Sequence, residues 1–314
     1  MTTRLLTIIS GQPLPNYIAI NEIQPNVVHC IYTPKYGGMA EKLEALRAVV
    51  GRNLPGIEFE LHPVDDPLDA AAIWSIAYQL LMQHDTDQWL LNRTAGTEQM
   101  RMPLAAAFDK AFTEPKAFFV ETERNQITFI KREGWVRDEY EFDKGGISVQ
   151  DYFALHGQYV HGGKLQEASE IHLYKELERL AFDDLMPSCT WIRAGNALAE
   201  YDIAATYNYK LYVFERKKLS MGSVYTRLPL EEQDKAVLHD IEKLAYTRAI
   251  FGGPFGIVYW LLSGGYIPKD SIKERMKVLG IRFIEGSDIN NLANNFKQNG
   301  LPPLKPKISK TQPT

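Results

Sequence analysis

The composition of the stretch around Asn208-Tyr209 predicts a β-hairpin on which three carboxylates and one ammonium group would converge on one patch. Side chains alternate along a strand, so Glu200 and Asp202 share one face of the first run, and Glu215 and Lys217 share one face of the second. A two-residue turn would place Asp202 opposite Glu215, and Glu200 opposite Lys217. Like charges placed opposite each other destabilise a sheet. We therefore expect a cation between them, supplied in part by Lys217 and in part by a divalent metal ion.

The alternative interpretation is a solvated edge hairpin with one cross-strand salt bridge. Against it, apolar residues such as Ile203 and Phe214 flank the acids, and a buried charge is costly unless it is paired or bound to a metal. The order of an Asp, a strand-turn-strand and then Glu-x-Lys resembles the PD-(D/E)xK signature of nucleases with a restriction-endonuclease-like fold. The hairpin is therefore the candidate catalytic element of the chain.

Strands and helices alternate from the N-terminus to about residue 121. Apolar and β-branched runs predict strands at 5–9, 27–32, 57–64, 89–91 and 117–121. Helices are predicted between them at 15–22, 39–50, 70–83 and 97–112. This alternation is typical of a parallel, doubly wound sheet, which binds ligands at the carboxyl ends of its strands. The residues of the loops at those ends are Ser10, Gly11, Gln12, Pro13, Thr33, Pro34, Lys35, Asn92, Arg93, Thr94, Ala95, Gly96 and Thr97.

The loop after the fourth predicted strand is the most informative one. Thr94, Gly96 and Thr97 lie where a strand passes into a helix, so hydroxyl and backbone N–H groups are available to a phosphate. Neither the Gly-x-Gly-x-x-Gly fingerprint of dinucleotide-binding folds nor a Walker Gly-Lys-Ser/Thr loop is present. A structural interpretation stays equally open, in which Thr94 caps the helix and Gly96 eases a tight turn.

The second half of the chain has a different pattern. A helix is predicted at 164–185, followed by strands at 190–193 and in the hairpin. Further helices are predicted at 231–249, 271–278 and 289–296, with strands at 256–262 and 282–284. We predict domains at residues 1–125 and 161–300, joined by a structured connector at 126–160, and a disordered tail at 301–314.

Composition bounds the cellular setting. The chain has 314 residues, which is room for two domains of ordinary size. Its formal net charge of −4 excludes a generally basic nucleic-acid-binding surface, although not a local basic groove. Its two cysteines, Cys30 and Cys189, lie far apart, which argues for a reducing cytoplasm and against a disulfide framework or a cysteine zinc site. No secretory signal or membrane-spanning apolar run is present, so we expect a cytoplasmic protein that contacts no membrane.

Both halves resemble one family, in the same order along the chain. The first half resembles the CARF domain, a Rossmann-like sensor of cyclic oligoadenylates, whose Thr-Gly-Gly-Thr-Lys-x-Met loop is matched by residues 94–100. The second half resembles the PD-(D/E)xK effectors of type III CRISPR defence. Its matching segments are Gly162 to Glu167, Glu200-Tyr201-Asp202 and Glu215-Arg216-Lys217. The resemblance implies an α/β chain with an N-terminal Rossmann-like CARF domain built on a parallel sheet, plus a C-terminal restriction-endonuclease-like α/β domain.

Three residues depart from the family pattern. In the sensor loop, Ala95 replaces a glycine and Glu98 replaces a lysine, which removes a positive charge near the expected ligand phosphates. Lys35 or Arg93 could substitute for that charge. Arg216 stands where the family often has an apolar residue or a cysteine. The residues of the predicted nuclease triad, Asp202, Glu215 and Lys217, are all present.

The resemblance implies a metal-dependent endonuclease that hydrolyses phosphodiesters. Asp202 and Glu215 would hold Mg²⁺ or Mn²⁺ through carboxylate oxygens, and Glu167 would complete or support that ligand shell. Lys217 would orient the attacking water or offset the charge that builds on the phosphate. Glu200 is either a further ligand or a salt-bridge partner of Lys217.

The resemblance also implies a homodimer whose two sensor loops share one cyclic oligoadenylate, with cyclic tetra-adenylate as the expected ligand. Binding would activate cleavage of a DNA or RNA substrate. Two alternatives stay open, a ligand-binding regulator with a vestigial nuclease site and a ring nuclease that degrades the cyclic ligand. The candidate ligand-contacting residues are Ser10, Gln12, Pro13, Thr33, Pro34, Lys35, Asn92, Thr94, Ala95, Gly96, Thr97 and Met100.

Overall fold

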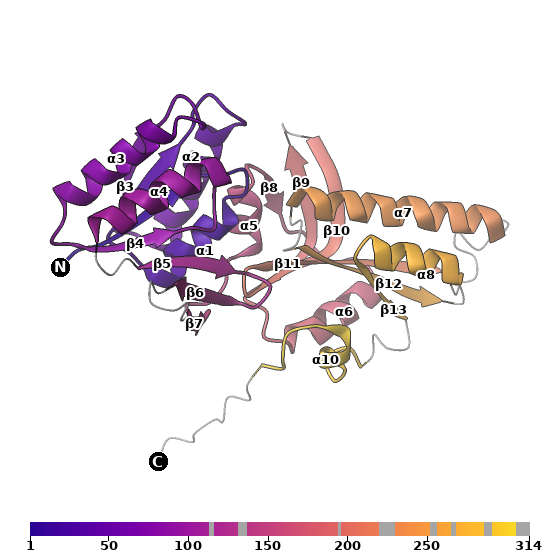
Figure 1. Ribbon diagram of the computed structural model, residues 1–314. Helices are drawn as coiled ribbons and strands as arrows, with labels where there is room; N and C mark the ends of the chain where they lie inside the picture. The colour runs from indigo at the N-terminus through magenta and orange to yellow at the C-terminus, as the bar shows by residue number, and fades with distance from the viewer. Residues whose placement is uncertain are drawn as a thin grey trace, which may run out of the picture. The chain divides into compact units, whose positions relative to one another are not determined.

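The computed structural model describes residues 1–112, 116–130, 137–193, 196–219, 230–251, 256–264, 268–285 and 291–305. They form two compact units, Met1–Gly145 with Asp151–Gln158, and Gly146–Gln150 with Tyr159–Thr314 (Figure 1). Most of the predicted disordered tail, from residue 306 onwards, lies outside the described residues. Within the described residues, no helix is long and apolar enough to cross a bilayer.

A seven-stranded sheet forms the first unit, in the order β3-β2-β1-β4-β5-β6-β7. The pairs among β1 to β5 are parallel, whereas β6 and β7 are added antiparallel at one edge. The predicted parallel sheet is therefore confirmed, with an antiparallel extension built from residues of the predicted connector. The strands are β1 (Thr3–Ile8), β2 (Val27–Tyr32), β3 (Glu58–Pro63), β4 (Gln88–Asn92), β5 (Ala117–Glu121), β6 (Gln126–Ile130) and β7 (Arg137–Glu141).

Four helices connect the parallel strands of this sheet. Right-handed crossovers place α1 and α2 on one face and α3 and α4 on the other, because the strand order reverses between β3 and β4. The α3–α4 face buries a continuous apolar core against β1, β2 and β4. At the start of α3, the Asp69 side chain accepts a hydrogen bond from the Ala72 amide, 2.9 Å away. The helices are α1 (Leu14–Ile23), α2 (Met39–Asn53), α3 (Ala70–Gln83) and α4 (Glu98–Ala111).

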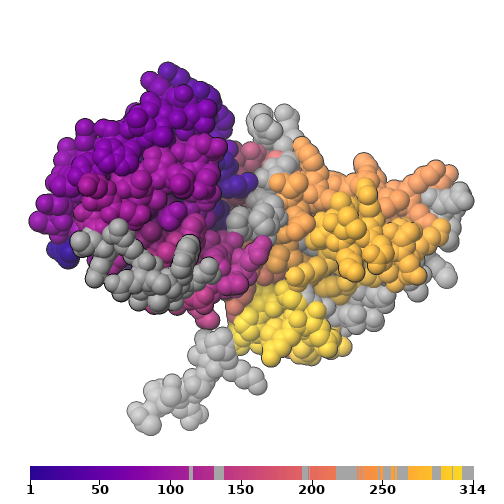
Figure 2. All heavy atoms as spheres, in the orientation of Figure 1, coloured from indigo at the N-terminus to yellow at the C-terminus, as the bar shows by residue number. Residues whose placement is uncertain are grey.

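The second unit has a six-stranded sheet in the order β13-β12-β11-β10-β9-β8. α6 and the segment leading to α10 pack on one face through Leu173, Leu177 and Leu292. α7 and α8 lie on the other side of this sheet (Figure 1), and their surface is visible in Figure 2. The strands are β8 (Tyr159–His161), β9 (Asp184–Arg193), β10 (Asn196–Tyr207), β11 (Lys210–Leu219), β12 (Gly256–Gly264) and β13 (Ile281–Glu285). The helices are α6 (Ala168–Glu178), α7 (Leu230–Phe251), α8 (Asp270–Val278) and α10 (Phe296–Asn299).

The helix predicted at 164–185 is too long. α6 covers only Ala168–Glu178, and β9 begins at Asp184. Leu180 forms an isolated bridge with Leu304, and residues from Asp184 onwards pair with β10. The apolar spacing that predicted a helix is therefore overridden by strand pairing with distant parts of the chain. A short helix, α5 (Val149–Leu155), also forms where the sequence predicted only a connector.

The predicted hairpin and its turn are confirmed. β10 and β11 pair antiparallel, and Tyr207 lies opposite Lys210. Asn208 and Tyr209 form the two-residue turn, with φ of 47° and 61°. Positive φ at both central residues is the geometry that matches the right-handed twist of the flanking strands.

Candidate functional site

The first candidate site lies at the carboxyl ends of β1 and β4. These strands are neighbours in the sheet, yet their following helices pack on opposite faces. Loops that leave neighbouring strands in opposite directions open a crevice between them, the usual ligand site of doubly wound sheets. The fold therefore brings the loop after β1, residues 9–13, beside the loop after β4, residues 93–97.

A buried hydrogen-bond network fixes the start of the β4 loop. The Asn92 Nδ2 donates to Thr7 Oγ1 at 3.2 Å and lies 3.4 Å from Asn16 Oδ1, while Asn92 Oδ1 accepts from the Thr94 amide at 3.0 Å. Thr94 Oγ1 in turn accepts a hydrogen bond from the Val120 amide at 2.7 Å. Thr7, Asn16 and Asn92 are fully buried. Asn92 and Thr94 thus hold the loop against β1, α1 and β5.

Gly96 is required at its position for two reasons. Its φ of +91° is a conformation that L side chains rarely adopt. A Cβ atom at Gly96 would also lie 2.8 Å from Cγ2 and 2.9 Å from Cδ1 of Ile8, inside normal contact distance. The glycine therefore lets the loop lie directly on the end of β1, which supports the structural interpretation of Gly96 beside the ligand-binding one.

The candidate ligand-contacting residues divide by exposure. The buried ones shape the loops from below, as Pro13 does when its carbonyl accepts hydrogen bonds from the first turn of α1. The exposed or half-buried ones are available to a ligand. Buried are Pro13, Thr33, Asn92, Ala95 and Met100. Exposed or half-buried are Ser10, Gln12, Pro34, Lys35, Thr94, Gly96 and Thr97.

Ion pairs offset several of the charged side chains around the loop after β4, which the sequence motif did not indicate. Glu98, which replaces the family lysine, pairs with Arg101 at 2.7 Å, so its negative charge is offset within the first turn of α4. Lys35 pairs with Asp65 at 2.8 Å in the exposed loop region. The Arg93 guanidinium lies over the Phe119 ring, 5.6 Å from its centroid, and its buried Nε has no hydrogen-bond partner among the residues that the structure describes.

Sequence reasoning missed Lys42. Its ammonium lies 3.6 Å from the position that a Cβ of Gly11 would occupy, so a cation from α2 reaches the loop after β1. The available signal was positional, because Lys42 stands in the first turn of the helix that follows the 33–38 loop. Within the described residues, Lys35 and Arg101 of this edge are held in ion pairs, whereas Lys42 and Arg93 are not.

The second candidate site lies where the hairpin strands separate. The described ladder between β10 and β11 runs from Tyr207–Lys210 to Ile203–Phe214. Beyond it, β10 continues against β9 and β11 continues parallel to β12. The predicted pairs Asp202–Glu215 and Glu200–Lys217 lie just past this ladder. On the other side of β10, Glu200 lies opposite Thr190 of β9, and its side chain is exposed.

Asp202 spans the separating strands with its side chain. Its Oδ2 accepts a hydrogen bond from the backbone amide of Arg216. The carboxylate therefore takes the place of a carbonyl in the ladder, and it is only half-buried. This fixes the position of one carboxylate oxygen relative to β11.

The Arg216 side chain lies among three acids. Burial lowers the pKa of its guanidinium, whereas the charges of Glu167, Asp202 and Glu170 raise it. Its Nε and Nη1 are buried and have no hydrogen-bond partner in the described part of the chain. Glu167 is the N-cap of α6 and forms a reciprocal capping box with Glu170. Arg216 thus provides positive charge beside two of the predicted metal ligands.

The structure brings only part of the predicted metal site together. Alternation along β11 directs Glu215 to the face opposite Arg216, and the Lys217 side chain lies outside the described residues. Within the described chain, the carboxylates of Glu167, Asp202 and Glu215 do not place three ligand atoms within 4.8 Å of one another. The donor set still fits a hard divalent cation, because carboxylate oxygens on adjoining strands are the ligands that Mg²⁺ and Mn²⁺ prefer.

The chain was compared with known proteins. No protein-family model and no curated protein sequence matches it. Solved structures do match. Can2 from Sulfobacillus thermosulfidooxidans, solved in complex with cyclic tetra-adenylate, aligns with a TM-score of 0.72 and 16% identity over 94% of this chain and 96% of its own. Protein VC1899 from Vibrio cholerae aligns with a TM-score of 0.70 and 13% identity over 94% and 97%.

In a third match, this chain aligns with part of a longer protein. A type III CRISPR defence DNA nuclease activated by cyclic oligoadenylate aligns with a TM-score of 0.58 and 14% identity, over 86% of this chain and 47% of that one. At these identities the likeness establishes the fold. The chain therefore shares the fold of Can2 and VC1899 along almost its whole length.

Proposed function

We propose that this protein is a metal-dependent endonuclease that a cyclic oligoadenylate activates, in the manner of a type III CRISPR defence effector. The observation that carries the proposal is the match over 94% of the chain with Can2, a structure that holds cyclic tetra-adenylate. The intact order of Glu167, Asp202, Glu215 and Lys217 in the second unit supports the nuclease assignment.

The sensing site that we propose is the edge formed by the loops after β1, β2 and β4. Cyclic tetra-adenylate carries four phosphates, which need cations or N–H donors. Lys42, Arg93 and the amides at Gly96 and Thr97, which precede α4, are the groups positioned for this role. We propose that the buried residues Asn92 and Met100 hold these groups in place without contacting the ligand. A homodimer would present two such edges to one cyclic ligand.

The nuclease site that we propose lies where β10 and β11 separate. Asp202 and Glu215 would hold Mg²⁺ or Mn²⁺, with Glu167 supporting them from the start of α6. When bound, the metal would polarise the phosphoryl oxygen and lower the pKa of a bound water. Lys217 would orient the attacking water and offset the negative charge that develops on the phosphate.

We also propose a role for Arg216, which is not one of the residues of the nuclease motif. Its guanidinium lies among Glu167, Glu170 and Asp202, so its single positive charge offsets part of their negative charge. Its Nε and Nη1, which have no hydrogen-bond partner in the described part of the chain, match the oxygens of a phosphodiester, which arginine binds well. We propose that Arg216 turns from the carboxylates to the substrate backbone when metal and nucleic acid enter.

The proposal is tested by cleavage of labelled single-stranded DNA, single-stranded RNA and supercoiled plasmid. Each reaction contains Mn²⁺ or Mg²⁺, with no ligand or with cyclic tri-, tetra- or hexa-adenylate. We expect cleavage that requires both a cyclic ligand and the Asp202 carboxylate, so Asp202→Asn should lose at least about a thousandfold in rate.

The same assay separates the alternatives. Cleavage of the cyclic ligand itself, unchanged by Asp202→Asn, would identify a ring nuclease. Ligand binding without cleavage of any nucleic acid would identify a regulator. Either outcome would refute the proposed effector.

A further inference from the structure

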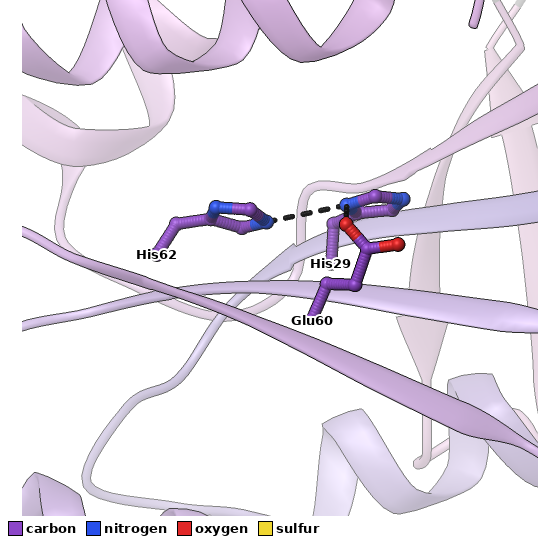
Figure 3. Close-up of side chains that lie close together, drawn as sticks. All are labelled: His29, Glu60 and His62. Carbon is purple, nitrogen blue, oxygen red and sulfur yellow. Dashed lines mark hydrogen bonds and ion pairs between the residues drawn. The ribbon is translucent and has the colours of Figure 1, made fainter.

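We propose that His29, Glu60 and His62 form a second metal site, which binds one divalent transition-metal ion of the Zn²⁺ class. Figure 3 shows the three side chains pointing toward one another. His29 stands on β2 directly beside Glu60 on β3, and His62 follows two residues later on the same strand. All three therefore project from the same face of the sheet, the face covered by α3 and α4. Ligands carried on strands are held more precisely than ligands on loops.

The distances suit a four-coordinate ion. His29 Nδ1 lies 3.2 Å from His62 Nε2 and 3.4 Å from Glu60 Oε2. All three ligand atoms lie within 4.8 Å of one another. Ligand bonds of about 2.0 to 2.2 Å place neighbouring ligands of a tetrahedral ion roughly 3.3 to 3.6 Å apart. An ion can therefore enter between these atoms with only small side-chain adjustments.

The chemistry of the ligands also favours a transition metal. His29 is fully buried beside the Trp89 ring, with 4.8 Å between ring centroids. Burial lowers the pKa of His29 to about 3 and also lowers the pKa of His62, so both imidazoles are neutral, the form that binds metals. Two imidazoles and one carboxylate are a zinc ligand set with an open fourth position. The proposed nuclease site differs, because its donors are carboxylate oxygens.

Arg4 determines which nitrogen of His29 carries the proton. Arginine only donates, so its Nη1, 3.0 Å from His29 Nε2, makes Nε2 the acceptor and leaves the proton on Nδ1. When the ion binds Nδ1, this proton moves to Nε2, so His29 stays neutral and Arg4 Nη1 turns from Nε2 to Glu60 Oε1, 3.6 Å away. Arg4 stays anchored to Asp87 at 2.7 Å. Without the ion, Arg4, Asp87 and Glu60 sum to one net negative charge; with a divalent ion bound by two neutral imidazoles, the cluster has one net positive charge.

The proposed metal site is accessible from solvent, and a bound ion would stabilise an edge strand of the sheet. The Glu60 side chain is 43% exposed, so an ion and a completing water can reach the cluster. Among the strands that the structure describes, β3 is the outermost at this end of the sheet and pairs with β2 alone. An ion shared by His29 on β2 and Glu60 and His62 on β3 would fasten this edge strand to its neighbour.

The experiment titrates Zn²⁺ and Co²⁺ separately into the full chain after chelator treatment. It uses the Asp202→Asn background, which weakens the proposed nuclease metal site. Calorimetry should find one Zn²⁺ bound per chain, and Co²⁺ should give the visible absorption of a four-coordinate ion with nitrogen ligands. His62→Ala and Glu60→Gln should each weaken binding by about a hundredfold or more.

The matched control is His84→Ala. The His84 ring lies 6.3 Å from the His29 ring but is not one of the three ligands, so its loss should leave affinity unchanged within about threefold. Hydrogen exchange of β2 and β3 verifies that each variant is folded. Absence of a bound ion in the Asp202→Asn protein would overturn the proposal. Equal affinity in His62→Ala and the parent would overturn it as well, and neither result depends on nuclease activity.

Discussion

Replacing Gly96 with alanine should destabilise the first unit through two separable effects. The φ of +91° is a left-handed conformation that costs an alanine about 1 to 2 kcal/mol, of which reduced freedom in the unfolded chain returns about 0.4 to 1 kcal/mol. The new Cβ would meet Ile8 at 2.8 to 3.1 Å, and overpacking of this kind costs about 1 to 3 kcal/mol. We therefore expect Gly96→Ala to lose about 2 to 4 kcal/mol.

Gly56 is the matched control for the conformational effect alone. Its φ is +103°, and a Cβ there would have no atom within 4 Å. Gly56→Ala should therefore lose only about 1 kcal/mol. The second partner is Ile8→Ala, which removes the atoms that the new Cβ would strike. The double variant Ile8→Ala with Gly96→Ala should be more stable than the sum of the single effects by about 1 to 3 kcal/mol.

The assay is hydrogen exchange of the β1 and β4 amides, read by mass spectrometry. This measures the opening free energy of the first unit, and it does not require the whole two-unit chain to unfold in one step. Equal stability of Gly96→Ala and Gly56→Ala would refute the steric argument. Strict additivity of Ile8→Ala and Gly96→Ala would refute it too, because no contact would then link the two positions.

Two further predictions concern charge. Burial lowers the pKa of His156 below its usual 6.5, and nearby Lys42 lowers it further, so the unfolded chain binds this proton more readily. The contribution of His156 to folding stability is complete above about pH 6.5 and is lost as pH falls, by up to about 1.4 kcal/mol per pH unit. In urea unfolding, the free energy of unfolding of His156→Gln should therefore depend less steeply on pH than that of the parent protein. Identical dependence in the two proteins would contradict the assignment. Arg216→Gln should strengthen Mn²⁺ binding at the carboxylates roughly tenfold, because a competing cation is removed. Electron paramagnetic resonance of added Mn²⁺ measures this in the His62→Ala background, and weaker binding would show that Arg216 helps to form the metal site.

Local pattern was sufficient to predict the first sheet. Apolar runs separated by Gly, Pro and Asn gave β2 and β5 with their observed bounds, because each buried strand is short and its loops contain residues that break regular structure. The turn at Asn208-Tyr209 was predictable for a similar reason, since the two strand-like runs leave only two residues between them. In these places the local preference and the tertiary fold agree.

Pairing between distant segments was not predictable in this way. The predicted helix at 164–185 failed at its C-terminal end because Leu180 forms an isolated bridge with Leu304 and the residues from Asp184 onwards pair with β10. The predicted connector at 126–160 contains β6 and β7, and nothing local assigned these strands to the first sheet.

The same limit applied to the sites. Asn92 was identified from its position after a strand, yet its full burial depends on Thr7 and Asn16, which are far away in sequence. Lys42 carries no motif and reaches the ligand edge only through the packing of α2. His29 and His62 are separated by 33 positions, so only the register of β2 and β3 reveals that their rings meet.

The hydrogen bond from the Arg216 amide to Asp202 makes a backbone proton a direct reporter of the proposed nuclease centre. The chemical shift of that amide depends on the charge of the oxygen that accepts it. Cation binding at Asp202 would draw electron density from this oxygen and move the Arg216 resonance. Nuclear magnetic resonance of the unaltered protein would thus report metal occupancy while the cyclic ligand is added, with no nucleic-acid substrate present.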